Sequence, residues 1–95
     1  MSLSAYALAA LAQELDRVAG STSGRNQQLN ASAFYLGRLI GAGVLGRREV
    51  EQRLLGAAEA CGYVAKDGAA AAHATIRSGL DRGELNPRAI QTRYW

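Results

Sequence analysis

The first apolar residues of the chain recur every three or four positions, which is the spacing of one face of an α-helix. This stripe predicts a helix over residues 4–19, with Ser4 as its N-cap and Gly20 as a left-handed residue that ends it. The residues predicted to face inward are Leu8, Leu11, Leu15 and Val18. Those predicted to lie largely off the stripe are Gln13, Glu14, Asp16 and Arg17. The polar, flexible residues 20–24 then break the pattern.

Three further segments carry the same spacing. One helix is expected over residues 26–40, and Gly41 and Gly43 are expected to stop it. Another is expected over residues 47–61 with Gly62 at its end, and the last follows Asp67 as N-cap and runs to Gly83. The predicted core residues are Leu8, Leu11, Leu15, Leu36, Ile40, Leu54, Ile76 and Leu80.

Composition supports an all-α fold, a compact bundle of about four helices. Nineteen of the 95 residues are Ala and 11 are Gly, so close helix contacts over small side chains are expected. Four Val and one Pro argue against a sandwich or barrel, which needs many β-branched strand residues. The length predicts one domain over residues 1–95, with residues 89–95 as a flexible tail.

Few residues are suited to catalysis. The single cysteine, Cys61, reads as a small buried residue, and the single histidine, His73, lies beside an apolar stripe with no evident nucleophile. One cysteine and one histidine leave little for a metal centre. The sequence therefore predicts no enzyme, no catalytic residue, no metal and no cofactor. With no long apolar run and no basic segment before an apolar start, we expect a cytoplasmic protein with no membrane partner.

The glycines between Gly37 and Gly46 invite comparison with a phosphate-binding loop. No Gly-Lys-Ser/Thr follows them and no strand precedes them, so that motif is excluded. Gly37 is better explained as a site of close helix packing.

The basic residues are more informative, because all but Lys66 are arginine and the net charge is +3. Arg25, Arg47 and Arg48 stand at predicted helix starts, where a cation opposes the helix dipole. Free backbone N–H groups there attract anions, so these arginines are candidate phosphate contacts. Our hypothesis is one DNA-binding face containing Arg25, Arg77 and Arg88, with Arg47 and Arg48 as a second contact. The alternative is that these arginines are dispersed, solvated charges.

A helix-turn-helix is a further alternative, with residues 62–66 as the turn and with His73 and Arg77 presented to a major groove. Four consecutive alanines, residues 69–72, offer the bases almost no hydrogen bonds, so this pattern is weak.

Three motifs resemble a known family. They are G-R-N-x-x-L-N from Gly24, A-F-x-L-G from Ala33 and T-I-x-S-G-x-x-x-G-x-x-x-P-R from Thr75. Together they resemble the small helical domain that ends many phage, plasmid and actinobacterial primase-polymerase and primase-helicase proteins, over about residues 8–88. The resemblance implies a replication accessory that helps a primase or helicase core engage DNA. The acidic primase motif and a nucleotide-binding motif are missing, so polymerase and ATPase activity are not implied.

Two function classes follow. The first is a non-catalytic, nucleic-acid-binding accessory module of a replication system that contacts the DNA phosphate backbone. The alternative is a protein-interaction module that docks on a replication or mobile-element enzyme, with Tyr94 and Trp95 as part of an apolar patch. A thin core also favours a homodimer as a way to bury more apolar surface.

Overall fold

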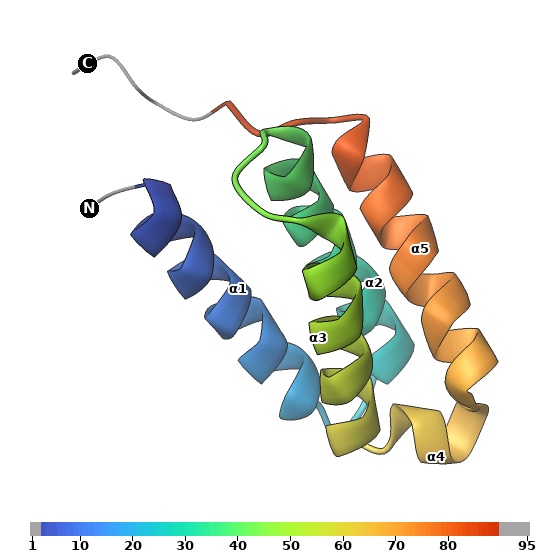
Figure 1. Cartoon of the computed structure of the whole chain (residues 1–95). Coiled ribbons are helices and arrows are strands. Elements are labelled where there is room, and N and C mark those ends of the chain that lie inside the picture. The colour runs from blue at the N-terminus through green and yellow to red at the C-terminus, as the bar shows by residue number, and fades with distance from the viewer. Residues whose placement is uncertain (1–2, 90–95) are drawn as a thin grey trace.

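The computed structural model describes residues 3–89, and every regular element in that range is a helix (Figure 1). The elements are α1 (Leu3–Ala19), α2 (Arg25–Gly41), α3 (Arg47–Ala60), α4 (Tyr63–Asp67) and α5 (Ala69–Glu84). The four long helices run along the bundle and α4 crosses one end of it (Figure 1). The predicted all-α bundle is confirmed. Most of the predicted tail, with Tyr94 and Trp95, lies outside the described residues.

The short helix α4 occupies the segment that the helix-turn-helix hypothesis assigned to a turn. Asp67 ends α4, and the N-cap of α5 is Gly68, with φ +91° and no side-chain cap, so the prediction of Asp67 as N-cap is wrong. Glycine adopts such a φ without steric cost, which explains why the break between α4 and α5 falls there. Two smaller predictions also fail: Ser4 lies inside α1, and Gly20 does not have a positive φ.

Helices α2 and α5 run parallel and pack closely over glycines on both helices. Each helix carries two glycines four residues apart, Gly37 and Gly41 in α2 and Gly79 and Gly83 in α5. A Cβ added at Gly37 would stand 2.6 Å from the Leu80 carbonyl oxygen, and one at Gly79 would stand 2.6 Å from the Ala33 Cβ. Only hydrogen side chains allow this approach, so the close packing predicted at Gly37 is confirmed. Gly41, which we expected only as a terminator, packs against Glu84 as well.

The core lies where α2 and α3 meet α1 and α5. Of the eight predicted core residues, five are fully buried: Leu11, Leu36, Leu54, Ile76 and Leu80. Leu15 and Ile40 are half-buried at the edge of the core, and Leu8 is 59% exposed, so its assignment to the core is wrong. The large buried residues outside that list of eight are Val18, Leu29, Leu39, Val50 and Tyr63, and of these Val18 was predicted to face inward.

The error at Leu8 arises because α1 is rotated relative to the expected stripe. Its inward face carries Ala7 and Glu14 in addition to Leu11 and Val18. Glu14 was expected off this face but is only 5% exposed, and its carboxylate accepts a hydrogen bond from Ser32 Oγ at 2.9 Å. The Ser32 hydroxyl in turn accepts from the Gln28 amide at 2.9 Å. A buried polar chain therefore joins α1 to α2 through a residue that was predicted to lie off the inward face of α1.

Candidate nucleic-acid interface

Arg25 is held against the end of a neighbouring helix. Its Nε donates to the backbone carbonyl of Cys61, the C-cap of α3, at 2.8 Å. Next to it, the Asn26 amide donates to the buried Tyr63 hydroxyl at 3.2 Å. Arg25 thus opposes the dipole of its own helix but lies at the negative end of α3, where a cation is favourable. A structural role accounts for its position.

Arg47 has a comparable explanation at the other end of α3. Its guanidinium forms ion pairs with Glu51 at 3.1 Å, with Asp81 at 2.7 Å and with Glu84. The hydrogen bond to Asp81 is the largest cause that raises the pKa of Arg47 above its ordinary value. Three carboxylates from two helices surround this one cation, which joins the start of α3 to the last turn of α5. Little of its charge remains for an external phosphate.

The five arginines singled out in the sequence are not brought together on one face. Arg88 donates its backbone N–H to the Arg38 carbonyl oxygen, about 20 Å along α2 from Arg25 at 1.5 Å per residue. Arg77 lies seven residues, about 10 Å, before the end of α5, whereas Arg88 follows that helix. Arg48 and Arg77 are exposed and make no side-chain hydrogen bond or ion pair within residues 3–89.

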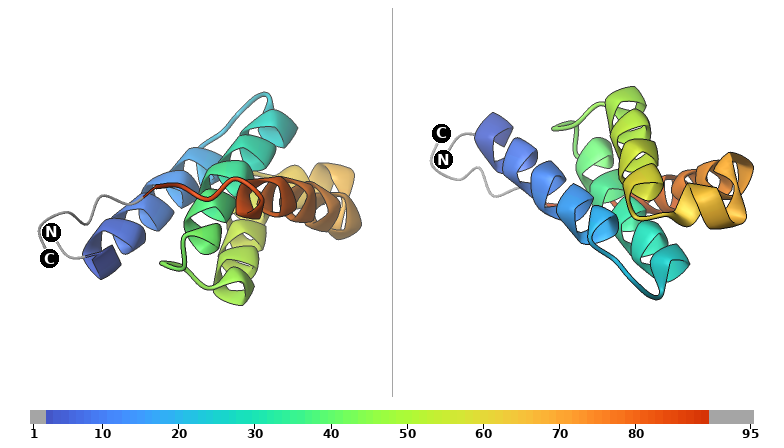
Figure 2. Two further views of the ribbon diagram at one scale, coloured as in Figure 1. Left: turned by 90° about the horizontal axis from the view of Figure 1, so that it is seen from above. Right: turned by 90° about the horizontal axis from the view of Figure 1, so that it is seen from below.

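Arg88 lies on two aromatic rings. Its guanidinium carbon is 5.2 Å from the centroid of Tyr6 and 5.7 Å from that of Tyr35, and Nη1 donates to the Tyr35 hydroxyl at 2.7 Å. The segment that follows α5 crosses the end of α2 towards α1, which brings Arg88 to this position (Figure 2). The hydrogen bond between the Tyr6 and Tyr35 hydroxyls and partial burial raise the pKa of the Tyr6 hydroxyl.

Two arginines that the sequence hypothesis passed over lie on the same side of α2. Arg82 reaches from α5 across Phe34, 5.5 Å from the ring centroid, and donates to the Asn30 side-chain oxygen. Arg38 follows Phe34 by one helical turn, and its Nε donates to the Asn86 carbonyl at 2.8 Å. Asn30, Phe34 and Arg38 are four residues apart, so they lie on one face of α2. This spacing is visible in the sequence.

We call this region the arginine–aromatic surface and define it by Phe34, Tyr35, Arg38, Arg82 and Arg88. Its three arginines bind neutral acceptors: a backbone carbonyl, an amide oxygen and a phenol. Within the described range, none of the three forms an ion pair with a carboxylate. Their positive charges are therefore held in position but remain unneutralised, unlike the charge of Arg47.

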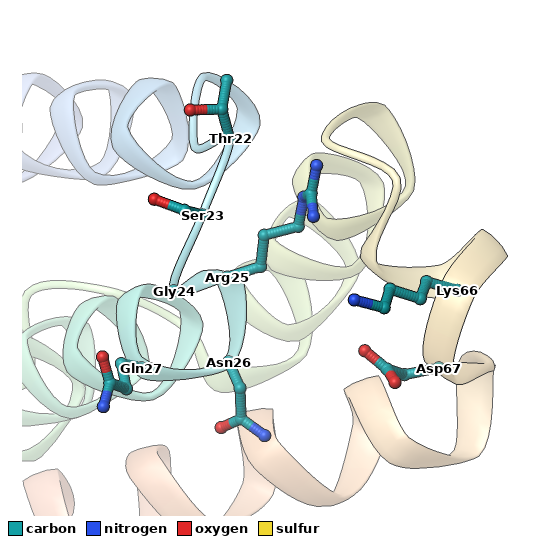
Figure 3. Close-up of a pocket in the computed structure, with 8 residues that line it drawn as sticks. All are labelled: Thr22, Ser23, Gly24, Arg25, Asn26, Gln27, Lys66 and Asp67. Carbon is teal, nitrogen blue, oxygen red and sulfur yellow. The ribbon is translucent and has the colours of Figure 1, made fainter.

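Residues of the described range line two depressions on the surface. One, of about 590 Å³, lies at the start of α2, where Lys66 and Asp67 face it together with Arg25 (Figure 3). Arg25 and Lys66 bring two positive charges to it and Asp67 one negative charge, and the Arg25 guanidinium is already bound to the Cys61 carbonyl oxygen. The other, of about 250 Å³, lies between α1 and α2 and has Tyr35 in its wall.

The residues considered for catalysis are not assembled into a site. His73 is exposed on α5, and Cys61 is half-buried with its thiol 3.5 Å from the Ala58 carbonyl oxygen. Among residues 3–89, no three His, Cys, Asp or Glu side chains are grouped as a metal would require. Within the same range, no helix has the length and apolar character needed to cross a bilayer.

Comparison with known proteins gives no assignment: no protein-family model, no curated protein and no solved structure matches the chain. The resemblance to the terminal domains of primase-polymerase and primase-helicase proteins therefore stays a prediction that rests on its three motifs.

Proposed function

We propose that this protein is a non-catalytic nucleic-acid-binding module that contacts phosphates through the arginine–aromatic surface. The observation that carries the proposal is that Arg38, Arg82 and Arg88 are all anchored by neutral partners. A guanidinium fixed in this way retains N–H donors and its full charge for a phosphate.

The composition of the surface supports the same conclusion. Arginine beside exposed or partly exposed aromatic rings is typical of nucleic-acid-binding surfaces, because the cation meets the phosphate and the ring meets a base. Phe34 and Tyr35 are both half-buried, so part of each ring is accessible. Arg88 belongs both to the DNA-contact hypothesis drawn from the sequence and to this surface. Arg38 and Arg82 are added to it.

The test is DNA binding by a triple variant, Arg38→Gln with Arg82→Gln and Arg88→Gln. Loss of three phosphate contacts should weaken binding to single- and double-stranded DNA alike at low salt. The matched control replaces three arginines away from this surface, Arg48, Arg53 and Arg77, by glutamine, which changes the net charge equally. Circular dichroism confirms that both variants are helical. Equal loss of affinity in the two variants would show that only net charge matters.

A protein-interaction module is the second candidate, and a different surface favours it. The outward side of α1 presents Leu8 at 59% exposure together with exposed Ala9 and Ala12. Residues at i, i+1 and i+4 form a narrow apolar stripe, which is the pattern of a helix that docks on another helix. A second copy of this chain could fill that stripe, as in a homodimer. Leu8→Gln should then abolish self-association in sedimentation experiments without loss of stability, since Leu8 is outside the core.

A role in DNA replication beside a primase or helicase core is the more specific form of the proposal, and the motif resemblance alone supports it. A cytoplasmic location belongs to the same proposal. The test is co-purification with the product of a neighbouring primase or helicase gene. Loss of co-purification in the triple arginine variant or in Leu8→Gln would show which of the two surfaces such a core uses.

A further inference from the structure

We infer that the depression between α1 and α2 receives an unpaired nucleobase, so that the nucleic acid bound is single-stranded. This inference rests on the proposed function, because it assigns a substrate class to a region that adjoins the arginine–aromatic surface through Tyr35. The depression is lined by Gln13, Glu14, Arg17, Gln28, Ala31 and Tyr35.

Charge distinguishes this depression from the arginine–aromatic surface. Its two ionised side chains, Glu14 and Arg17, form an ion pair at 3.2 Å, so they cancel. A phosphate would gain nothing from such a pair and would face the carboxylate. A neutral, polar ligand has no such penalty. The volume of the depression is about 250 Å³. Pockets that bind drug-sized ligands start at roughly 300 Å³, so this depression suits a smaller ligand such as one flat ring system.

The polar groups of the depression match the edge of a base. The Gln28 amide donates one hydrogen bond to Ser32 and keeps its carbonyl oxygen and second N–H. Gln13 is exposed, and its side chain has no hydrogen-bond partner in the described part of the chain. A carboxamide offers an acceptor and a donor side by side, which is the arrangement that base edges complement.

Tyr35 connects this depression to the phosphate-binding arginines. Its ring forms part of the wall, while its hydroxyl accepts the hydrogen bond from Arg88 at 2.7 Å. A strand whose phosphates lie on Arg88 and Arg38 would therefore place a neighbouring base beside the Tyr35 ring. Bases in a duplex are stacked and paired and cannot enter, so the arrangement selects single strands.

The experiment measures fluorescence anisotropy with three labelled ligands of equal length: a mixed-sequence single strand, an abasic strand and a duplex. The single strand should bind at least about fivefold more tightly than the abasic strand, the lower end of what stacking on one aromatic ring provides. Tyr35→Leu, which keeps apolar bulk, should bring this ratio towards one. Gln13→Ala should also reduce it, whereas Gln52→Ala, an exposed glutamine on α3, should leave it unchanged.

The outcomes separate the two levels of the proposal. Binding of all three ligands with equal affinity would overturn the single-strand inference and leave phosphate binding in place. Binding of none would overturn both. A ratio that persists in folded Tyr35→Leu and Gln13→Ala variants would show that bases are recognised elsewhere, which also overturns the assignment of this depression.

Discussion

The Arg88 guanidinium lies 5.7 Å from the centroid of the Tyr35 ring and donates to the hydroxyl of that same residue at 2.7 Å. This pair fastens the segment after α5 to α2, and the Tyr6 ring, 5.2 Å from the same guanidinium carbon, extends the contact to α1. Three helices therefore meet at one arginine. The same contact orients a positive charge that has no carboxylate partner among residues 3–89.

Alkaline pH should weaken the hydrogen bond between the Tyr6 and Tyr35 hydroxyls. The hydrogen bond with Tyr35 and burial raise the pKa of Tyr6 above 10.0, so the folded protein holds the phenol proton more tightly than the unfolded chain. The resulting stability is complete below about pH 10 and disappears as pH rises through the raised pKa. Urea unfolding across this range should show a steeper alkaline decline for wild type than for Tyr6→Phe. Parallel declines would contradict the prediction.

Gly83 should tolerate no side chain. A Cβ there would overlap the Phe34 carbonyl oxygen and stand 2.8 Å from both the Arg38 nitrogen and the Gly37 Cα. Gly83→Ala should lower the free energy of unfolding by about 1 to 3 kcal/mol, because backbone atoms must move. Gly56→Ala is the control: Gly56 is in α3 with nothing within 4 Å of the added Cβ, and alanine should raise stability by about 0.5 to 1 kcal/mol. Urea unfolding should therefore show changes of opposite sign in the free energy of unfolding of the two variants. Changes of the same sign would contradict the close α2–α5 packing.

The buried chain from Gln28 through Ser32 to Glu14 should be sensitive to loss of its central hydroxyl. Ser32→Ala removes the donor to a carboxylate that is 5% exposed, and an unsatisfied buried group costs about 1 to 3 kcal/mol. Ser78→Ala, on the exposed side of α5, should change the free energy of unfolding by less than about 0.5 kcal/mol. Similar values for the two serines would mean that Arg17, which pairs with the same carboxylate at 3.2 Å, or water satisfies Glu14 without Ser32.

Arg47 should contribute more to stability than an ordinary surface arginine. Arg47→Gln leaves Glu51, Asp81 and Glu84 without their shared cation, and we expect a loss of about 1 kcal/mol that shrinks as salt rises. Arg53→Gln breaks one pair with Glu49 in which both side chains are more than half exposed, so its effect should be smaller than about 0.5 kcal/mol. Thermal unfolding at two salt concentrations compares them.

Periodicity and composition were sufficient to predict the four long helices, because the spacing of leucine and valine reflects the local geometry of each segment. The five-residue helix α4 was missed, since it is too short to carry a periodic stripe. The rotation of α1 could not be predicted in this way. A stripe of leucines outweighs Ala7 and Glu14 in any hydrophobic pattern, yet Glu14 is buried because Ser32, 18 residues later, supplies its hydrogen bond. Such a partner is visible only once the chain is folded.

The candidate site shows the same limit. Arg25 and Arg47 stand at helix starts, and their partners, the Cys61 carbonyl and the carboxylates of Asp81 and Glu84, are 34 to 37 residues away in sequence. The sequence shows the unfavourable position but not the tertiary contact that compensates it. Arg38 and Arg82 were left out because the partners that hold them, the Asn86 carbonyl and the Asn30 side chain, are 48 and 52 residues away in sequence.

The most direct test of the account is the salt dependence of single-strand binding by wild type and by the Arg38, Arg82 and Arg88 triple glutamine variant. Each phosphate contact contributes about 0.7 to the slope of log affinity against log salt concentration. We expect a slope shallower by about 2 in the folded triple variant, while the Arg48, Arg53 and Arg77 triple variant keeps the wild-type slope. An unchanged slope in the first variant would contradict phosphate binding at this surface.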